Sequence, residues 1–396
     1  MKRLWVLMAV CFVDMLGLMM VGPLMPFYAL SFDAADWMVG PLLSAFAVAQ
    51  LLSSPYWGRF SDRYGRRPAL MVGLSTAAIA FAVFGFASAL WMLFAARVAQ
   101  GLGGGTTGVA QAYVADTMAP GERAKALGWL SAATNLGVVI GPNIGSLAYR
   151  WGPAAPGLAA AGIVLLNVAF AWRWLPESRV PHHAAAPAPA GRSVRQALTE
   201  IVRHPGRPAH RVIWIYVVGM LALNMVIGTL ALYLKHTFGV TAETVGTFFV
   251  IFGIVNVAMR ILLVGWCNAR FGEVRTMQIG AVLLTLGLVL MPLPTTVVAF
   301  VVAMSLVPIG TALLFPASTS LVSQRTESAE LGLVMGAQQT FRGIMSIIGP
   351  IGATVIFDTL GHGVPFFVAA GTVVVAAVLA AREPRERSVP ATFSTP

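Results

Sequence analysis

Charged side chains are scarce in this chain. They account for 10% of its 396 residues, whereas typical soluble domains contain about 25%. Hydrophobic residues make up 58% of the sequence, and the mean hydropathy is +0.79. This composition excludes a soluble globular protein. Several apolar runs reach the roughly 20 residues that cross a bilayer as a helix, so the sequence predicts an all-α polytopic membrane protein.

Cysteine and histidine are also rare. The two cysteines, Cys11 and Cys267, fall in a predicted span and a predicted turn, which argues against a disulfide. The histidines lie in a predicted linker or in loops: His182, His183, His204, His210, His236 and His362. The sequence lacks H-E-x-x-H, C-x-x-C and a phosphate-binding loop. We therefore expect no metal site, no cofactor, no use of ATP and no enzymatic activity.

Acidic residues are few: 15 Asp and Glu against 26 Lys and Arg give a net charge of +11. Such a charge could indicate nucleic-acid binding, but most basic residues lie between apolar runs on one predicted side of the membrane. That distribution sets topology and attracts anionic lipids, so no nucleic-acid partner is expected. Lys2 and Arg3 precede an apolar run that is too long for a cleaved signal peptide, so the N-terminus is predicted to be retained.

About twelve runs are long enough to cross the membrane. They cover residues 5–30, 37–57, 69–89, 91–113, 124–148, 154–174, 210–234, 242–264, 276–295, 297–320, 331–357 and 364–381. The predicted parts are an N-terminal six-helix bundle at 1–175, a cytoplasmic linker at 176–208, a C-terminal six-helix bundle at 209–382 and a cytoplasmic tail at 383–396. The linker contains HHAAAPAPAGR, typical of a flexible segment, and a short surface helix is expected near Val194–Val202. An even number of spans places both termini in the cytoplasm.

The two halves of the chain resemble each other. GRFSDRYG at 58–65 recurs as GWCNARFG at 265–272, and VIGPNIG at 139–145 recurs as IIGPIGA at 347–353. ERAKALG at 122–128 recurs, with the same spacing of Glu and Gly, at Glu330–Gly336. The three pairs are separated by nearly the same length of chain. The sequence therefore predicts two six-helix bundles related by a parallel repeat, with a substrate site at their interface.

The segment GRFSDRYGRRPAL, Gly58 to Leu70, joins two of the apolar runs. Its four arginines place the segment in the cytoplasm: Arg59, Arg63, Arg66 and Arg67. Asp62 is available to pair with them. Gly58 and Gly65 suit positions that need a positive φ or a close approach of helices. We expect a tight turn. It either only fixes topology, or holds helices together and releases them during a conformational cycle.

With RVAQGLGGG at 97–105 and GVVIGPNIG at 137–145, this segment resembles three signature motifs of the major facilitator superfamily. The combination is similar to the twelve-span drug–proton antiporters, including tetracycline-resistance efflux proteins, over essentially the whole chain. The resemblance implies the major facilitator fold. It also implies that Asp116, which lies shortly before Arg123, pairs with Arg66 at the cytoplasmic face. In the second copy Ala269 and Glu273 replace Asp62 and Arg66, so the first copy is expected to matter more.

Asp14 is the acidic residue that we place inside a span. It lies roughly 14 Å into the first run at 1.5 Å per residue, where a charge costs at least ~2.5 kcal/mol. A carboxyl group there could take up and release a proton, and so couple transport to protons. It could also stay neutral or hold helices together by a hydrogen bond. Its context, DMLGLMMVGPLMP, resembles the first span of the antiporters, which favours the coupling role.

Arg97 and Gln100 belong to the fourth predicted span. An always-charged guanidinium needs a partner or water there, and the depth of Arg97 differs from that of Asp14 by only about 6 Å. The resemblance implicates this arginine in proton transfer, with Arg97 stabilising the ionised Asp14. The alternative is an arginine bonded to backbone carbonyl groups. GGGTTG at 103–108 matches a nucleotide-binding pattern but follows no strand, so its small residues are predicted to let helices approach.

The fifth span is interrupted by small residues and a proline: Gly137, Gly141, Pro142 and Gly145. Proline kinks a helix, and spaced glycines give a closely packing face. In the resembling family this motif typifies exporters. Simple packing glycines are the alternative.

Polar residues in the C-terminal spans are candidates for the substrate cavity: Asn224, Gln338, Gln339 and Arg342. Gln338 precedes Arg342 by one helical turn, on the same face. They either contact substrate or form an interhelical hydrogen-bond cluster. A buried Arg342 in the cavity would favour an anionic or zwitterionic substrate.

The sequence thus predicts a secondary active transporter, which exports a small, largely apolar organic compound or drug in exchange for protons by alternating access. A proton-coupled carrier of a metabolite or siderophore and a non-transporting receptor with the same fold remain alternatives. The expected partners are a small-molecule substrate, protons and the lipid bilayer of the cell membrane. The chain is expected to act as a monomer.

Overall fold

The structure is a computed structural model that describes residues 2–178, 194–327 and 330–381. Every regular element in these ranges is a helix, so the predicted all-α class is confirmed. The first half contains α1 Lys2–Val21, η1 Gly22–Leu24, α2 Met25–Ser31, η2 Asp36–Met38, α3 Val39–Tyr64, α4 Arg66–Gly85, α5 Leu90–Leu102, α6 Thr106–Thr117, η3 Pro120–Glu122, α7 Arg123–Tyr149 and α8 Ala155–Trp174. The second half contains α9 Val194–Arg203, α10 Pro208–Phe238, α11 Val245–Leu290, α12 Val297–Gln324, α13 Leu331–Leu360 and α14 Val364–Ala381.

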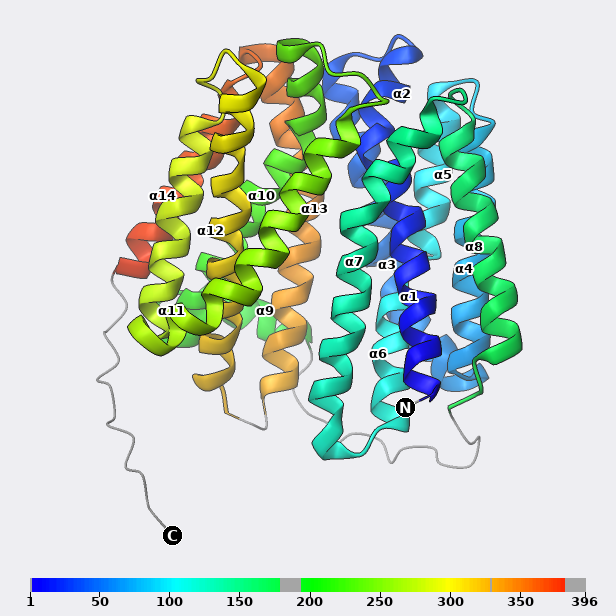
Figure 1. Ribbon diagram of the computed structural model, residues 1–396. Helices are drawn as coiled ribbons and strands as arrows, with labels where there is room; N and C mark the ends of the chain where they lie inside the picture. Colours follow the sequence, from blue (N-terminus) through cyan, green and yellow to red (C-terminus); the bar gives the residue numbers. More distant parts are fainter. Residues whose placement is uncertain (1, 179–193, 328–329, 382–396) are drawn as a thin grey trace. The chain divides into compact units, whose positions relative to one another are not determined.

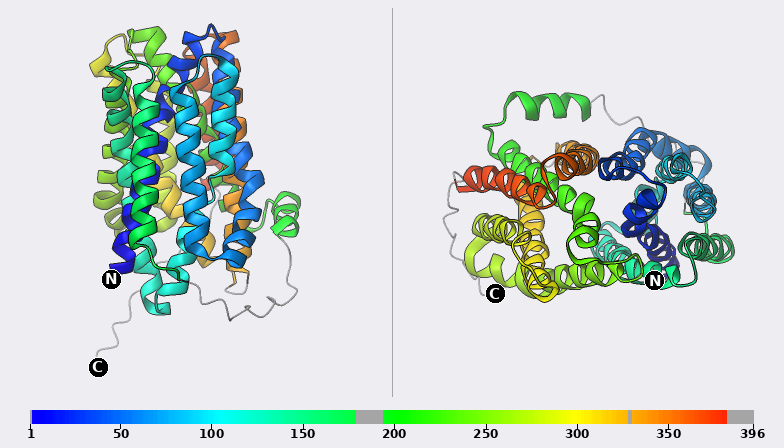
Figure 2. Two further views of the ribbon diagram at one scale, coloured as in Figure 1. Left: turned by 90° about the vertical axis from the view of Figure 1, so that its right-hand side faces the viewer. Right: turned by 90° about the horizontal axis from the view of Figure 1, so that it is seen from above.

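Nine helices in the described ranges are long and apolar enough to cross a membrane. The remaining three of the twelve predicted crossings also have a place in the fold. α11, with 46 residues, covers two predicted spans. The fourth predicted span is divided between α5 and α6, and α7 has 27 residues. Figure 2 shows the helices α1–α8 from the side, where their axes are roughly aligned, and end-on from above.

Spatial packing divides the chain into two compact units. Unit 1 comprises residues 1–191, 224–253 and 346–365, and unit 2 comprises 192–223, 254–345 and 366–396. Unit 1 therefore combines the N-terminal half with segments of α10, α11 and α13. These boundaries follow contacts in space, whereas the predicted bundles at 1–175 and 209–382 follow the sequence repeat. The repeat-based division stays a prediction.

Large apolar side chains cover much of the surface of each unit. Trp91 and Leu166 of unit 1 are 70% and 72% exposed, and Ile261 of unit 2 is 75% exposed. In water such exposure would be unfavourable, but lipid tails are as apolar as these side chains. The helical backbone satisfies its own hydrogen bonds, which is what a membrane requires. The surface therefore fits a membrane protein.

The expectation of a turn at Gly58–Leu70 is wrong for most of its length. α3 continues to Tyr64 and α4 begins at Arg66, so only Gly65 separates the two helices. Gly65 has the expected positive φ, +102°, whereas Gly58 is helical and a Cβ there would meet no atom within 4 Å. Long charged side chains reach water from a helix end without leaving the helix. Their polarity therefore does not end α3.

The predicted span at 91–113 is not one continuous helix. α5 ends at Leu102 and α6 begins at Thr106, and Gly103–Gly105 form turns between them. Each glycine in a helix costs up to about 1 kcal/mol relative to alanine, so three in succession favour a break. Gly101 also fits tightly, because a Cβ there would lie 2.3 Å from the Phe46 carbonyl oxygen of α3. Within the predicted segment, a Cβ at Gly103 would lie 3.1 Å from the Gly73 oxygen of α4, so the close approach of helices is confirmed at that glycine.

Side chains of α3 bind the carbonyl groups at this break. Gln50 Nε2 donates to the Gly104 oxygen at 2.9 Å, and Trp57 Nε1 donates to the Leu102 oxygen at 2.6 Å. The Ser53 hydroxyl donates to the oxygen of Gly101 at 3.2 Å. Backbone groups that lose helical partners inside a membrane need such replacements. These bonds therefore stabilise the break and hold α3 against it.

The second-half counterpart of the α3–α4 junction lies inside α11. α11 is helical on both sides of Gly272, whose own φ of +78° and ψ of 166° are not helical. The predicted turn near 265–272 is therefore reduced to a single glycine, as it is at Gly65. The short surface helix expected near Val194–Val202 is confirmed as α9, which buries Ala197 and Ile201.

Candidate functional site

The glycines of α7 press directly on the backbone of α1. A Cβ added at Gly137 would lie 2.5 Å from the Phe12 oxygen, and one at Gly145 would lie 1.9 Å from the Met20 oxygen. Gly141, between them, would meet the Leu16 oxygen at 2.8 Å. No side chain fits at these separations, so hydrogen is required at all three positions. Figure 1 shows α1 and α7 side by side along their length.

Asp14 lies on the stretch of α1 that these glycines contact, between Phe12 and Leu16. Its carboxylate oxygen Oδ2 accepts a hydrogen bond from the Thr106 hydroxyl at 2.7 Å. Thr106 is the first residue of α6 and is 6% exposed, while Asp14 is partly buried. The glycine break between α5 and α6 thus ends beside the carboxyl group. Sequence reasoning missed Thr106, although its position directly after three glycines was a usable signal.

Arg97 and Gln100 form a second buried pair in α5. Arg97 donates through Nη1 to Gln100 Oε1 at 3.1 Å, and the two residues are 4% and 3% exposed. The expected contact between Arg97 and Asp14 is not formed among the described residues. Gln100, one turn away in the same helix, accepts a hydrogen bond from the Arg97 guanidinium. The Asp14 carboxylate is instead bound by the Thr106 hydroxyl. The structure therefore places two separate polar pairs within the α1, α5 and α6 region of unit 1.

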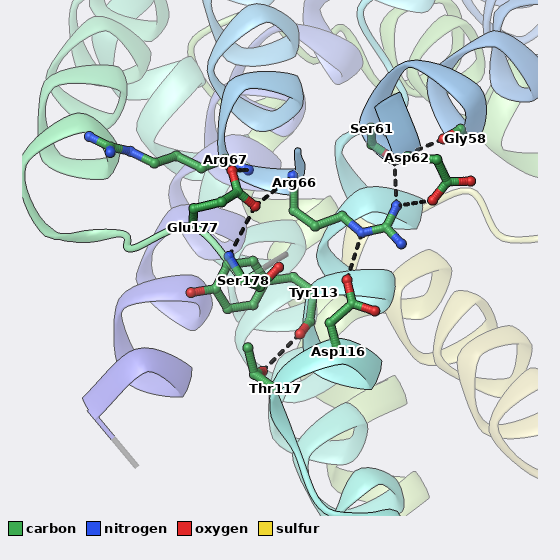
Figure 3. Close-up of polar contacts among 10 residues, drawn as sticks. All are labelled: Gly58, Ser61, Asp62, Arg66, Arg67, Tyr113, Asp116, Thr117, Glu177 and Ser178. Carbon is green, nitrogen blue, oxygen red and sulfur yellow. Dashed lines mark hydrogen bonds and ion pairs between the residues drawn. The ribbon is translucent and has the colours of Figure 1, made fainter. Parts of the chain in front are cut away.

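A cluster of charges surrounds the start of α4, where Arg66 is central (Figure 3). Its Nε donates to Asp116 Oδ2 at 2.8 Å, and its Nη1 lies 2.9 Å from Asp62 Oδ1. The same Nη1 donates to the Ser61 hydroxyl at 2.7 Å. The contact expected between Arg66 and Asp116 is present, and Asp62 also pairs with this arginine. We call these residues, with Glu177, the arginine cluster.

Glu177 completes the arginine cluster from the end of α8. Its carboxylate accepts from the backbone N–H of Arg66 at 2.9 Å and from that of Arg67 at 3.1 Å. The first N–H groups of a helix have no partner within the helix. An acidic group at this end also interacts favourably with the positive end of the helix dipole. The Arg67 guanidinium donates to the Trp172 oxygen. α3, α4, α6 and the chain after α8 therefore meet at this cluster.

The remaining motif residues lie at the edge of the arginine cluster or outside it. The Arg63 guanidinium lies 5.4 Å from the ring centroid of its neighbour Tyr64. Arg123 donates through Nε to the Met118 oxygen at 3.2 Å and not to Asp116. Glu177 was missed by sequence reasoning. Its place directly after the sixth span was the available signal.

The second-repeat copy of the cluster has different chemistry. Glu273, which aligns with Arg66, accepts from the Ser320 hydroxyl at 2.6 Å. Ala269 occupies the place of Asp62 and has no charge to contribute. The copy retains the glycine with positive φ but replaces the two ion pairs of Arg66 with a hydrogen bond to a serine. This difference agrees with the expected asymmetry between the copies.

The predicted cavity residues are divided between the two units. Asn224 lies in unit 1 and is buried. In unit 2, buried Gln338 donates through Nε2 to the Thr319 hydroxyl at 3.2 Å, whereas Gln339 and Arg342 are exposed. Arg342 lies close enough to Arg260 of α11 for the two guanidinium groups to repel each other. Their contact with substrate stays a prediction.

Unit 1 also contains close contacts between the first and second repeats. Gly246 at the start of α11 donates its N–H to the Ser146 hydroxyl at 2.9 Å, and a Cβ on Gly246 would lie 2.3 Å from the Pro142 oxygen. The Ser44 hydroxyl donates to the Ile347 oxygen of α13 at 2.8 Å. Pro142 itself lies inside α7, which is one continuous helix, so the predicted interruption of the fifth span is wrong. The glycines of the antiporter-type motif therefore face α1, whereas Pro142 and the following Ser146 face α11.

Known proteins match this chain over nearly its whole length. The family model of the Major Facilitator Superfamily matches residues 7–227 and 212–395. The tetracycline resistance protein, class B, of Escherichia coli is 26% identical over 364 residues, covering 91% of this chain and 89% of that protein. Multidrug resistance protein 2 of Bacillus subtilis (strain 168) is 28% identical over 378 residues, covering 93% and 92%.

Solved structures share the fold. The human organic anion transporter MFSD10 (TETRAN) has a TM-score of 0.70 at 20% identity, covering 96% of this chain and 99% of that one. A mutant of the nucleoside transporter NupG has a TM-score of 0.77 at 12% identity, covering 95% and 99%. The fold, the family model and the full-length relatives agree with one another. This chain belongs to the Major Facilitator Superfamily and is a multi-pass membrane transporter of small molecules, not an enzyme.

Proposed function

We propose that this transporter exports a small, largely apolar organic compound or drug in exchange for protons, by alternating access. Its full-length relatives are named for tetracycline and multidrug resistance, which supports efflux rather than uptake of a metabolite or siderophore. The site of export is the cell membrane, with both termini in the cytoplasm. That orientation follows from the arginines of the α3–α4 junction, because basic residues in short loops stay inside.

The observation that carries the proposal is the hydrogen bond between Asp14 and Thr106. A carboxyl group in a membrane span is costly, and this one is held by a hydroxyl that can either donate or accept. When Asp14 is ionised, the Thr106 hydroxyl donates to it. When Asp14 takes up a proton, the carboxyl group gains an O–H that can donate to Thr106, so the hydrogen bond can reverse its direction. A proton can therefore change how α1 is held against α6.

Arg97 supplies the second element of this proposal. Its pairing with Gln100 leaves Arg97 Nε without a hydrogen-bond partner among the described residues. A buried guanidinium in that situation is poised to pair with a carboxylate that comes within reach. We assign to Arg97 and Gln100 the role of holding a positive charge near the proton site. The exchange partner for the proton is the substrate.

The arginine cluster is the proposed cytoplasmic gate. Its ion pairs join α3, α4 and α6, and Arg66 is only 11% exposed while it contacts Asp62 and Asp116. Charge-assisted hydrogen bonds are stronger than neutral ones but can be broken when the helices separate and water enters. The cluster therefore favours one arrangement of the cytoplasmic helix ends without making it permanent. The chain is proposed to work as a monomer.

The test is transport by membrane vesicles that contain wild-type or variant protein at matched folded amounts. A substrate screen in a host that lacks its own pumps, with and without an uncoupler, first identifies a transported compound. Asp14→Asn is then expected to abolish uphill, proton-driven transport, because an amide cannot cycle a proton. Asp33→Asn, which changes an exposed acidic residue in the loop after α2, is the matched control and should transport normally.

Each outcome bears on a different part of the proposal. Full proton-driven accumulation by Asp14→Asn would remove Asp14 from the coupling mechanism. Accumulation by the wild-type protein that does not change with the uncoupler would contradict proton exchange itself. Failure to move any compound in either direction, by well-folded wild-type protein, would favour a receptor that has kept the fold.

A further inference from the structure

Two histidines and an aspartate converge at the end of unit 1 away from the arginine cluster. Asp36 begins η2, before α3; His236 lies in the last turn of α10; His362 lies in the turn after α13. One ligand atom of each residue lies within 4.8 Å of those of the other two. α3 has 26 residues, so this group and the arginine cluster lie at opposite ends of a helix about 39 Å long.

Packing orients the three side chains toward one another. His236 Nε2 lies 3.1 Å from Asp36 Oδ2 and 3.2 Å from Oδ1. The His362 ring stacks on Phe357, with 4.6 Å between centroids and an interplanar angle of 18°, and its centroid lies 4.7 Å from that of His236. Phe357 is 1% exposed and so offers a fixed surface. Gly361, with φ of +114°, turns the chain so that His362 returns to this surface.

The donor set is one that binds transition metals. Zn²⁺ takes imidazole nitrogen and carboxylate oxygen at about 2.0–2.2 Å, and tetrahedral geometry then places ligand atoms roughly 3.4 Å apart. His236 and Asp36 already have this separation. His362 forms ring contacts but no hydrogen bond within the described residues, so a ring nitrogen is available to an ion. Ligand atoms within 4.8 Å of one another need to close by at most about 1.4 Å to reach the tetrahedral separation. Water would supply the fourth ligand.

Access and charge also suit a cation. The side chains of His236 and Asp36 are 31% and 14% exposed, so an ion can arrive from water while the carboxylate keeps part of its shielding. A carboxylate offsets one of the two positive charges of the ion. Imidazole favours Zn²⁺, Cu²⁺ and Ni²⁺ over Mg²⁺ and Ca²⁺, which prefer oxygen ligands. The chemistry therefore selects a transition metal.

We propose that Asp36, His236 and His362 bind a divalent transition-metal ion, with Zn²⁺ the best fit, and that the bound ion slows transport. Asp36 belongs to the first sequence repeat, and the two histidines belong to the second. An ion held by all three residues joins the repeats at this end of unit 1. The effect on transport rests on the proposed function, because alternating access requires the repeats to separate there, whereas binding of the ion does not depend on it.

Binding is measured first, with full-length purified protein and Zn²⁺ alone. Isothermal titration should give one saturable site, and the apparent Tm should rise with Zn²⁺ concentration, because a ligand that binds only the folded state stabilises it. His236→Gln, His362→Gln and Asp36→Asn should each weaken Zn²⁺ binding at least tenfold. His204→Gln is the matched control, since His204 is an exposed histidine in unit 2, and it should bind as the wild type does. Mg²⁺ at the same concentrations should give no shift.

Transport is measured second, in the vesicle assay with an identified substrate. Zn²⁺ should inhibit the wild type and His204→Gln, and a chelator should reverse the inhibition. The three site variants should transport at the wild-type rate without Zn²⁺ and resist inhibition at least tenfold better.

No saturable Zn²⁺ binding by folded wild type, or equal binding by all three variants, would overturn the site and leave an Asp36–His236 ion pair only. If Zn²⁺ binds the wild type and not the variants, but does not inhibit transport by the wild type, the proposed effect on transport is overturned. A wild type that binds Zn²⁺ but transports nothing would refute the proposed function and leave the metal site intact.

Discussion

Adding one methyl group at Gly65 should destabilise the arginine cluster more than it would at the other glycines of the junctions. Its φ of +102° is one that side chains other than hydrogen rarely allow, and a Cβ would lie 2.5 Å from Glu177 Oε2. The backbone strain costs about 1–3 kcal/mol. Displacement of Glu177 also removes the hydrogen bonds to the N–H groups of Arg66 and Arg67, a capping loss of about 0.5–2 kcal/mol. Gly65→Ala should therefore destabilise the protein by about 1.5–5 kcal/mol.

Two other glycines separate these contributions. Gly272 has a φ of +78° but open space around a Cβ, so Gly272→Ala should cost the strain of about 1–3 kcal/mol alone. Gly58 lies inside α3 with open space around it, so Gly58→Ala should be neutral or stabilising by up to about 1 kcal/mol.

The assay is thermal unfolding of the purified variants in one detergent, read as apparent Tm. The expected order of stability is Gly58→Ala, then Gly272→Ala, then Gly65→Ala. Equal Tm values for Gly65→Ala and Gly272→Ala would show that the Glu177 contact contributes nothing. A Gly65→Ala protein as stable as Gly58→Ala would refute the backbone reasoning.

Three further perturbations test the cluster, the α1–α7 contact and the substrate charge. Arg66→Ala should lower turnover tenfold or more with little change in KM, because it removes charge-assisted hydrogen bonds worth about 1.5–3 kcal/mol each. Glu273→Ala should have a milder effect on turnover. Equal losses of turnover in the two variants would contradict the asymmetry between the two copies of the junction. Gly145→Ala should lower the apparent Tm by the cost of overpacking, about 1–3 kcal/mol or more, whereas Gly162→Ala, where a Cβ meets nothing within 4 Å, should not; similar Tm values would argue against the close contact. Arg342→Gln should lower transport of an anionic compound about tenfold relative to a cationic one, since it removes an exposed positive charge that attracts anions. A uniform loss in paired accumulation assays would make this arginine structural.

The sequence was sufficient for the features that composition and repetition determine. Apolar length predicted the spans, and the repeated motifs predicted that the junction at Gly65 recurs at Gly272. Sequence reasoning predicted the wrong helix boundaries where polar side chains lie on a backbone that stays helical. The charges of Gly58–Leu70 suggested a turn, but a helix end carries such charges without breaking, because the side chains extend to water. Only the glycine with positive φ interrupts the backbone.

One partner across helices was predicted from the resemblance to the family. That resemblance implied a pair between Asp116 and Arg66, and the pair is formed. Thr106 was not predicted, because it carries no charge that would point to Asp14 and the two residues are distant in sequence. Similar estimated depths suggested a contact between Arg97 and Asp14. Depth along the membrane normal does not specify which way each helix faces.

The tight fit of α7 against α1 has a consequence for motion. Gly137 and Gly145 are about 12 Å apart along α7, and both allow only hydrogen against the α1 backbone. Sliding one helix past the other would drive Cα atoms into carbonyl oxygens, so α1 and α7 must be displaced together as one rigid body. Ser146, the residue after Gly145, accepts a hydrogen bond from the Gly246 N–H. A displacement that begins at Asp14 on α1 therefore reaches the start of α11 through this helix pair, with no flexible loop to absorb it on the way.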